Sequence, residues 1–146
     1  MKTHFKIFSC LLLFFLSANS HAQTSMEELH NYVKKFPKGR YSYQQIADKL
    51  ALNAKGDFDK AKLIYLWIAE NIDYDVKALN SGNLPDGSPE KTLRRKKAVC
   101  DGYARLYSAM AEYLGLQVEM INGFSKGGPD DKVSKNSDHS WNLLKI

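Results

Sequence analysis

A cysteine and a histidine are the residues of this chain best suited to chemistry. Cys100 begins a segment whose apolar residues recur at intervals of three and four, which is typical of an amphipathic helix, and Gly115 is its predicted end. A thiol at a helix start lies among unpaired backbone N–H groups and at the positive end of the helix dipole, which favours the nucleophilic thiolate. The same N–H groups suit the charge that develops on a substrate oxygen, so this position favours acyl transfer.

His139 is the candidate general base. It begins a stretch in which His139 and Trp141 alternate with Ser140 and Asn142, so a strand there would place the imidazole on the same face as the indole. His30 has no motif around it. By itself, a histidine at a strand start is more typical of a surface or hydrogen-bonded core residue, and a lone cysteine of a buried, inert one. Whether the two form a pair therefore depends on the elements that carry them.

The first 22 residues have the three-part layout of a secretory signal peptide. Lys2 and Lys6 give a basic start, Ile7–Leu16 is an apolar run, and Ser20-His21-Ala22 offers small residues for cleavage after Ala22. The apolar run is shorter than the ~20 residues that a spanning helix needs. Cys10 lies near the start of that run rather than after it, which argues against a lipid anchor. We therefore expect a secreted or periplasmic protein without stable membrane insertion.

Removing residues 1–22 leaves 124 residues, enough for one compact domain. Cys100 would then have no disulfide partner in the chain. The net formal charge would fall from +5 to +3, because two lysines are lost, and the basic run Arg94–Lys97 has no aromatic residues between its charges. We therefore expect no nucleic-acid partner. One cysteine and one histidine fall short of a zinc ligand set, so we also expect no metal and no cofactor.

The chain begins with helical patterns. Ser25 and Glu28 form a capping box that opens a first helix, and residues 43–54 predict a second helix with Gly56 as its stop. Asp57 is the expected cap of a third helix. The first helix carries Leu29, Tyr32, Val33 and Phe36, and the apolar stripe of the third comprises Ala61, Ile64, Tyr65, Ile68 and Ile72, widened by Leu66 and Trp67.

The second half of the chain predicts loops and strands around the helix that Cys100 begins. Residues 78–90 hold two glycines and two prolines and predict a surface loop, after which Arg94–Lys97 could add positive charge near the thiol. Gly102 removes side-chain bulk that would otherwise lie beside the sulfur. Residues 117–122 alternate like a strand, residues 124–137 predict a loop, and the last strand begins at about His139.

Three segments together resemble the core of the transglutaminase-like superfamily, in the style of the kyphoscoliosis peptidases and other secreted bacterial members. They are residues 60–75, which include WIAENIDYD, then Val99–Ala104 (VCDGYA), and Asp138–Asn142 (DHSWN). The likeness runs over residues 57–146, with residues 23–56 as an N-terminal helical segment. It implies a papain-like α+β fold, in which the helix that begins with the cysteine packs on a small antiparallel sheet that carries the histidine.

The resemblance also implies roles for individual residues. Cys100 would attack an amide carbonyl, and His139 would take the thiol proton and later pass it to the leaving amine. Water as acceptor would give hydrolysis of a protein or peptide substrate, whereas a lysine side chain would give crosslinking. Tyr74 lies where related proteins place an aromatic residue near the oxyanion region, so it is a candidate donor, with core packing as its alternative role.

The family's third catalytic residue, an acid on the strand after the histidine, is not present in this sequence, which we interpret as C-terminally truncated. Asp138 is adjacent to His139 and would point to the opposite face, so it is a poor substitute, while Asn122 on the preceding strand is a conceivable one. The alternative function is a catalytically inactive relative that binds peptides or amides derived from the cell wall.

Overall fold

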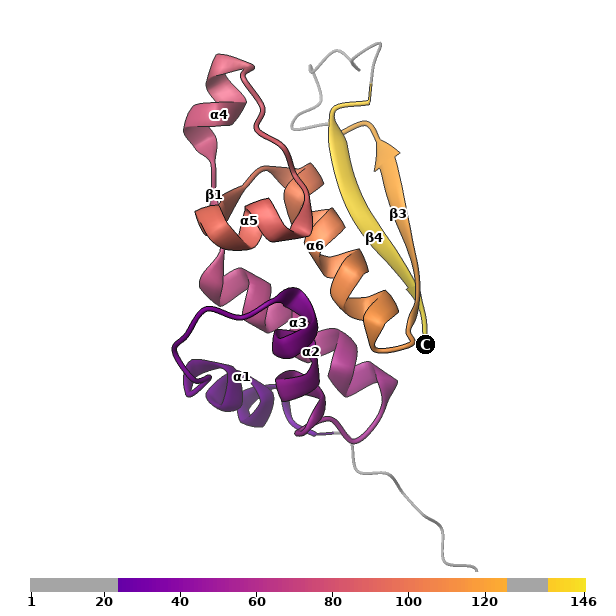
Figure 1. Ribbon diagram of the computed structural model, residues 1–146. Helices are drawn as coiled ribbons and strands as arrows, with labels where there is room; N and C mark the ends of the chain where they lie inside the picture. Colours follow the sequence, from indigo (N-terminus) through magenta and orange to yellow (C-terminus); the bar gives the residue numbers. More distant parts are fainter. Residues whose placement is uncertain (1–23, 126–136) are drawn as a thin grey trace, which may run out of the picture.

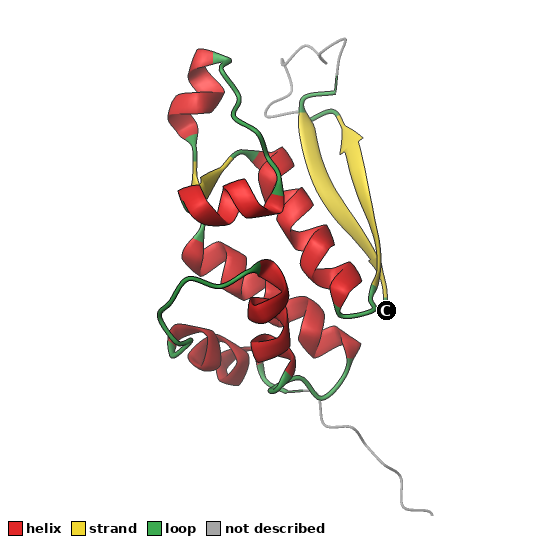
Figure 2. Cartoon of the chain, viewed as in Figure 1, coloured by secondary structure: helices red, strands yellow, loops and turns green. Residues whose placement is uncertain are grey.

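The computed structural model describes residues 24–125 and 137–146. The predicted signal peptide, residues 1–22, lies outside the described residues, as does most of the predicted loop before His139. The described chain runs through three helices, a short strand, two short helices, a second short strand, a long helix and a hairpin of two strands (Figure 1). Figure 2 shows the helices gathered on one side of that hairpin.

The first two helices, α1 (Met26–Lys34) and α2 (Tyr43–Ala51), both begin with capping boxes. The Ser25–Glu28 box is confirmed, because the Ser25 hydroxyl accepts from the Glu28 N–H and the Glu28 carboxylate accepts from the Ser25 N–H. Ser42 and Gln45 form an equivalent box in α2. Because α2 ends at Ala51, three residues before its predicted end, Gly56 does not stop it.

Helix α3 (Asp57–Asn71) is the most deeply buried of the three, with Leu63 and Ile64 fully enclosed. Gly56 is its N-cap and Asp57 its first helical residue, so both predicted roles at this junction were wrong. After α2 the Asn53 N–H donates to the Leu50 carbonyl, and the Ala54 N–H donates to the Ala51 carbonyl. The chain therefore turns before Gly56, which is left to begin the next helix. The predicted stripe is buried except for Tyr65, which is 61% exposed.

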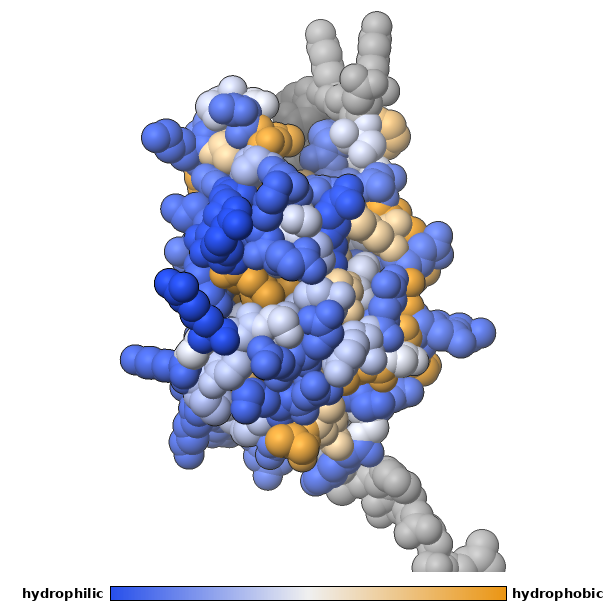
Figure 3. Space-filling model, in the orientation of Figure 1, coloured by the Kyte–Doolittle hydropathy of each residue, from blue (hydrophilic) through white to orange (hydrophobic). Residues whose placement is uncertain are grey.

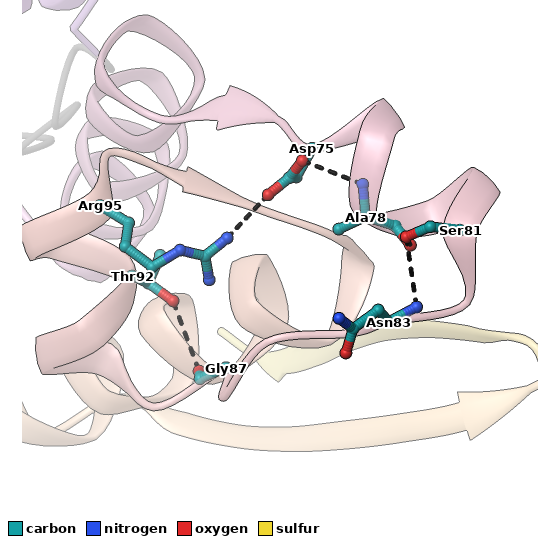
Figure 4. Close-up of polar contacts among 7 residues, drawn as sticks. All are labelled: Asp75, Ala78, Ser81, Asn83, Gly87, Thr92 and Arg95. Carbon is teal, nitrogen blue, oxygen red and sulfur yellow. Dashed lines mark hydrogen bonds and ion pairs between the residues drawn. The ribbon is translucent and has the colours of Figure 1, made fainter.

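The prediction of one surface loop over residues 78–90 was wrong, because helices α4 (Val76–Ser81) and α5 (Pro89–Arg95) occupy both of its ends. Asp75 caps α4 by accepting from the Ala78 N–H at 3.1 Å. The same carboxylate pairs with Arg95 of α5 at 2.7 Å (Figure 4). Six or seven residues are too few to show helical periodicity, so these elements depend on the Asp75 cap, on this ion pair and on the burial of Ala78, Thr92 and Leu93.

A pair of two-residue strands connects this region to the nucleophile helix. Strand β1 (Asp73–Tyr74) pairs in parallel with β2 (Lys97–Ala98), so that Tyr74 lies opposite Ala98. The Asp75 N–H extends the ladder by donating to the Ala98 carbonyl at 2.8 Å. Because Ala98 is two residues before Cys100, this register brings the end of α3 next to the start of the following helix.

Helix α6 (Cys100–Tyr113) forms the centre of the fold. Leu106, Met110 and Ala111 are fully buried against the other helices, and Gly115 follows the helix with a φ of 77°, a left-handed conformation that favours glycine. On another side of α6 lies an antiparallel hairpin of β3 (Gln117–Gly123) and β4 (His139–Lys145). The predicted α+β class is therefore confirmed. Within residues 24–125 and 137–146, no helix has the length and hydrophobicity that crossing a membrane requires.

Gly102 has a role different from the one predicted. A Cβ at this position would lie 2.7 Å from the Ala98 Cβ and 3.0 Å from the Thr92 Oγ1. The glycine therefore permits the first turn of α6 to pack against α5 and β2, rather than making space beside the sulfur.

We expect Gly102→Ala to lower the free energy of unfolding by about 1–3 kcal/mol, because the added methyl group overpacks this junction. Gly56→Ser is the control, since a Cβ at Gly56 meets nothing within 4 Å and serine is a favoured N-cap. Urea unfolding of the two variants measures the difference. Equal stability of Gly102→Ala and the parent protein would contradict this packing role.

Candidate active site

One pocket of about 680 Å³ lies between α3, the start of α6 and β4. All three predicted site residues, Cys100, His139 and Tyr74, line it. They come from the ends of three different elements, which the register of β1 with β2 and the packing of β4 on α6 bring together. The remaining walls are mainly aromatic and apolar, and include Phe58, Tyr65, Tyr103, Tyr107 and Trp141.

Cys100 is the first residue of α6 and is half-buried. The N-cap is Val99, and no side chain caps this end of the helix. The first intrahelical bond runs from the Tyr103 N–H to the Val99 carbonyl at 3.1 Å, so the N–H groups of residues 100–102 have no partner within the helix. Asp101 is held away by an ion pair with Arg105 at 2.8 Å. The start of the helix next to the thiol thus has backbone N–H groups that no side chain caps.

His139 is exposed at the start of β4, and its ring lies 5.9 Å from that of Trp141 at an angle of 31°. The predicted alternation is confirmed, because His139, Trp141 and Leu143 are exposed while the residues between them are partly buried towards α6. Among the described residues, no hydrogen bond joins Cys100 to His139.

Neither Asp138 nor Asn122, the two candidates for orienting the imidazole, forms a hydrogen bond to His139 among the described residues. The Asp138 carboxylate accepts from the Ser125 N–H at 2.6 Å and from its hydroxyl at 3.1 Å. The Asn122 side chain accepts from the Ser140 hydroxyl at 2.7 Å. Both side chains are therefore engaged in linking β3 to β4, and this agrees with the expectation that Asp138 is a poor substitute.

Tyr74 is 43% exposed, so core packing does not explain its position. Its ring lies 6.0 Å from that of Tyr103, at an angle of 33°. The Tyr103 hydroxyl donates to the Ile72 carbonyl, which fixes Tyr103 against the end of α3. The Tyr74 phenol is consequently supported on one side by a fixed ring and open to the pocket on the other.

The predicted contribution of the basic run to the thiol environment was wrong. Arg95 pairs with Asp75, while Arg94 and Lys96 line a different pocket. Among the described residues around the thiol pocket, Lys62 is the one cation, and its Nζ lies 4.4 Å above the ring of Phe58. Arg94, Arg95 and Lys96 are thus engaged away from the thiol pocket. The helix terminus is therefore the main positive feature beside Cys100.

Sequence reasoning did not identify Asn142 as a structural determinant of the site. Its amide donates to the Ala104 carbonyl at 3.1 Å and to the Ser108 hydroxyl at 2.9 Å, both on α6. These two bonds fix the position of β4 along the helix and therefore the position of His139 relative to Cys100. The only available signal was the predicted placement of Asn142 on the face opposite His139.

Burial raises the pKa of two tyrosines beside the pocket. The Tyr107 hydroxyl donates to the Ala61 carbonyl at 3.1 Å, and desolvation raises its pKa to about 12. The pKa of Tyr103 is also raised, mainly by desolvation and further by Asp73 and Tyr74. Both phenols therefore remain neutral donors at physiological pH. Across residues 24–125 and 137–146, no group of three or more His, Cys, Asp or Glu residues is placed to hold a metal ion.

The family model of the transglutaminase-like superfamily core matches residues 44–146. The chain belongs to this superfamily. Kyphoscoliosis peptidase from Mus musculus is 30% identical over 134 residues, which are 84% of this chain and 20% of the mouse protein. The Homo sapiens protein of the same name is 32% identical over 103 residues, which are 68% of this chain and 16% of that protein. This transglutaminase-like chain thus spans a fifth or less of the length of these relatives.

Solved structures support the fold. A crystal structure of a TGase superposes with a TM-score of 0.53 at 23% identity, over 82% of this transglutaminase-like chain and 33% of the other. A candidate protease from Parabacteroides distasonis superposes with a TM-score of 0.53 at 16% identity, over 83% and 24% of the two chains. The predicted recognition of the superfamily and its fold is therefore confirmed.

Replacing Asn142 with alanine should loosen β4 on α6, because the Ser108 hydroxyl loses its partly buried partner. We expect a loss of about 1–3 kcal/mol in the free energy of unfolding. Asn122→Ala removes an exposed hydrogen bond of the same hairpin and should cost less than about 0.5 kcal/mol. Urea denaturation followed by circular dichroism measures both. If the two variants were equally stable, Asn142 would not determine the position of the strand.

The raised pKa of Tyr107 predicts how stability depends on alkaline pH. A group whose pKa is higher in the folded state binds its proton more tightly there, so its contribution is complete below the unfolded value of about 10. It is lost as the pH rises towards the folded value of about 12. We expect the free energy of unfolding to fall across this interval, and to fall less steeply in Tyr107→Phe. Urea unfolding at pH 9, 10, 11 and 12 tests this, and identical slopes would contradict it.

Proposed function

We propose that this protein is a cysteine-dependent acyl-transfer enzyme that acts on amide bonds of proteins or peptides. The observation that carries the proposal is that Cys100 and His139 line one pocket, although 39 positions separate them in the chain. Membership in the transglutaminase-like superfamily supports the same chemistry.

In the proposed reaction, the imidazole of His139 takes the thiol proton, and the Cys100 Sγ forms a bond to the carbonyl carbon of the substrate. The protonated imidazole then gives this proton to the amide nitrogen as the C–N bond breaks and the amine leaves. The product of this half-reaction is a thioester. Water, or a second amine such as a lysine side chain, attacks the thioester, His139 takes its proton, and the thiol is regenerated.

The uncapped start of α6 supplies the second element of the mechanism. The N–H groups of residues 100–102 lack intrahelical partners, and no side chain caps them. An oxyanion beside Sγ would accept from such groups, which are fixed before the reaction begins and therefore need no reorganisation. The Tyr74 hydroxyl is a further candidate donor, because the phenol lines the same pocket and is half-exposed.

The walls of the pocket support a peptide as substrate. They consist mainly of aromatic rings, including Phe58, Tyr65 and Trp141. Such walls accommodate apolar side chains on either side of a scissile amide, and the exposure of Tyr65 and Trp141 leaves a broad entrance. The layout of residues 1–22 supports secretion to the periplasm or beyond.

A second candidate function is an inactive relative that binds peptides in the same pocket. It is favoured by the absence of any carboxylate that contacts His139 among the described residues. An imidazole without an orienting partner is a weaker base, since both its tautomer and its direction are unconstrained.

Replacing Cys100 or His139 with alanine distinguishes an enzyme from an inactive peptide-binding relative. In a transglutaminase-like enzyme, we expect Cys100→Ala to abolish both amine release from a peptide library and incorporation of a fluorescent amine into an unfolded protein. His139→Ala should lower the rate by about 10²–10⁴, the usual contribution of a general base. Lys145→Ala, at an exposed position of the same strand as His139, is the control and should retain full activity.

Binding of the same peptides to Cys100→Ala is measured in parallel. Full activity of Cys100→Ala would contradict the proposed function. Peptide binding without turnover, even at high concentrations of the parent protein, would instead support the inactive relative.

A further inference from the structure

A second pocket of about 820 Å³ lies between the α1–α2 connection and α5. It shares no lining residue with the pocket of Cys100, because α3 separates the two, with Ile68 facing the thiol pocket and Trp67 facing this one. In Figure 3, a hydrophobic hollow lies between the α1–α2 connection and α5, flanked by strongly hydrophilic side chains. We call it the Trp67 pocket, and the residues that matter below are Phe36, Arg40, Tyr41, Trp67, Arg94 and Lys96.

The charge around the Trp67 pocket is strongly positive. Lys38, Arg40, Arg94 and Lys96 line it, whereas Glu90 is its one described acidic residue. None of these four cations forms an ion pair with a described carboxylate. This contrasts with Lys60, Lys91, Arg95 and Arg105, each of which pairs with an aspartate at 2.6–2.8 Å. The cations of the pocket are therefore available to an anionic ligand.

The indole of Trp67 provides a second, independent observation. Trp67 is 2% exposed, and its Nε1 is buried without any hydrogen-bond acceptor among the described residues. Phe36 packs edge-on against the indole at 5.8 Å, and the Lys96 Nζ lies 4.9 Å above its ring. A buried donor without a partner is unfavourable until an acceptor reaches it, which is unusual in a well-packed domain.

Lys96 is held in this position by an unusual backbone conformation. Its φ of 55° is left-handed, a conformation that glycine adopts far more readily than lysine. The conformation is fixed at both peptide groups, because the Lys96 N–H donates to Thr92 at 2.8 Å and its carbonyl accepts from Asp73 at 2.9 Å. Desolvation over the indole lowers the pKa of the Lys96 amine. An anion in the pocket would stabilise the charged form of the Lys96 amine.

We propose that the Trp67 pocket binds an acidic peptide segment in which carboxylates alternate with apolar side chains. The carboxylates would pair with Arg40, Arg94 and Lys96, and an oxygen of the segment would be the acceptor that the indole N–H lacks. The apolar side chains would occupy the hollow beside Phe36 and Tyr41. The segment binds independently of catalysis, because α3 lies between this pocket and Cys100.

A peptide fits these features better than a nucleic acid or a simple anion. Single-stranded nucleic acids bind through bases stacked on accessible aromatic faces. Here Trp67 is 2% exposed, and Phe36 makes T-shaped contacts with both Tyr41 and Trp67, so the Phe36 and Trp67 rings are engaged with neighbouring side chains. An inorganic anion would satisfy the cations but leave the apolar part of the hollow unoccupied.

Fluorescence of Trp67 reports binding directly. The sequence contains two tryptophans, so a Trp141→Phe background leaves Trp67 as the single reporter. An acetylated and amidated octapeptide of alternating glutamate and leucine is titrated against a peptide with glutamine in place of glutamate. We expect saturable binding of the acidic peptide, weakened by added salt, and at least about tenfold weaker binding of the neutral one.

Two double variants that each remove two positive charges, one inside the Trp67 pocket and one outside it, test whether the peptide binds there. Arg40→Gln combined with Arg94→Gln should weaken binding by about tenfold or more, and each single change should weaken it in part. Lys77→Gln combined with Lys145→Gln removes two exposed charges outside the pocket and should leave the affinity unchanged. All four arginine and lysine positions are exposed, and thermal unfolding checks that each variant remains folded.

Several outcomes would overturn the proposal. Equal binding of the acidic and neutral peptides, or equal losses in the two double variants, would remove the pocket as the binding site. Stronger binding of a single-stranded oligonucleotide, or displacement of the peptide by inorganic phosphate at the same concentration, would assign the cations to a different ligand. Self-association that is abolished by Arg40→Gln with Arg94→Gln would show that another copy of the chain occupies the pocket.

Discussion

The placement of β4, which carries His139, on α6, which begins with Cys100, depends on the side-chain amide of Asn142. This one group donates to two acceptors on successive turns of α6, Ala104 and Ser108, and so fixes β4 along the helix. Because side chains alternate along a strand, a shift of one residue would move Asn142 away from α6 and reverse the direction of His139. The hydrophobic contact of Leu144 with the core favours the same face of β4 but is not directional. The ladder with β3 sets the register of β4, and the two Asn142 hydrogen bonds add a directional link between β4 and α6.

Helix α6 serves both the core and the candidate chemistry because its two ends have different surroundings. Its middle is enclosed by the other helices, as the full burial of Leu106 and Met110 shows. Its first turn packs against α5 and β2 through Gly102, but no side chain caps it and Cys100 is half-buried beside a pocket. The rigid interior of the helix thus holds a polar, unsatisfied terminus at the surface of a pocket. Such a terminus is suited to stabilise negative charge, provided that the surrounding structure keeps it in place.

Helix α3 separates two pockets of opposite character. One face contributes to the thiol pocket, whose described lining contains Lys62 as its one cation, and the other contributes Trp67 to a pocket lined by four cations. The short elements α5 and β2 produce this separation. They send Arg94 and Lys96 to the Trp67 pocket, while Arg95 is bound by Asp75. The distribution of charge in this domain is therefore a consequence of the chain path over residues 89–98.

The sequence by itself determined the long elements and the chemically capable residues. The capping box at Ser25, the periodicity of α6 and the alternation of β4 are local patterns, and so is the position of Cys100 at a helix start. The tertiary structure decided what local patterns do not encode. Helices α4 and α5 are too short for a periodic signal and depend on the pair of Asp75 with Arg95, and the β1–β2 register follows from contacts between distant segments. Packing also brings Cys100 and His139 to one pocket, anchors Asn142 on α6 and directs Arg94 and Lys96 to the other pocket. Each of these results involves side chains from separate elements, which local patterns do not encode.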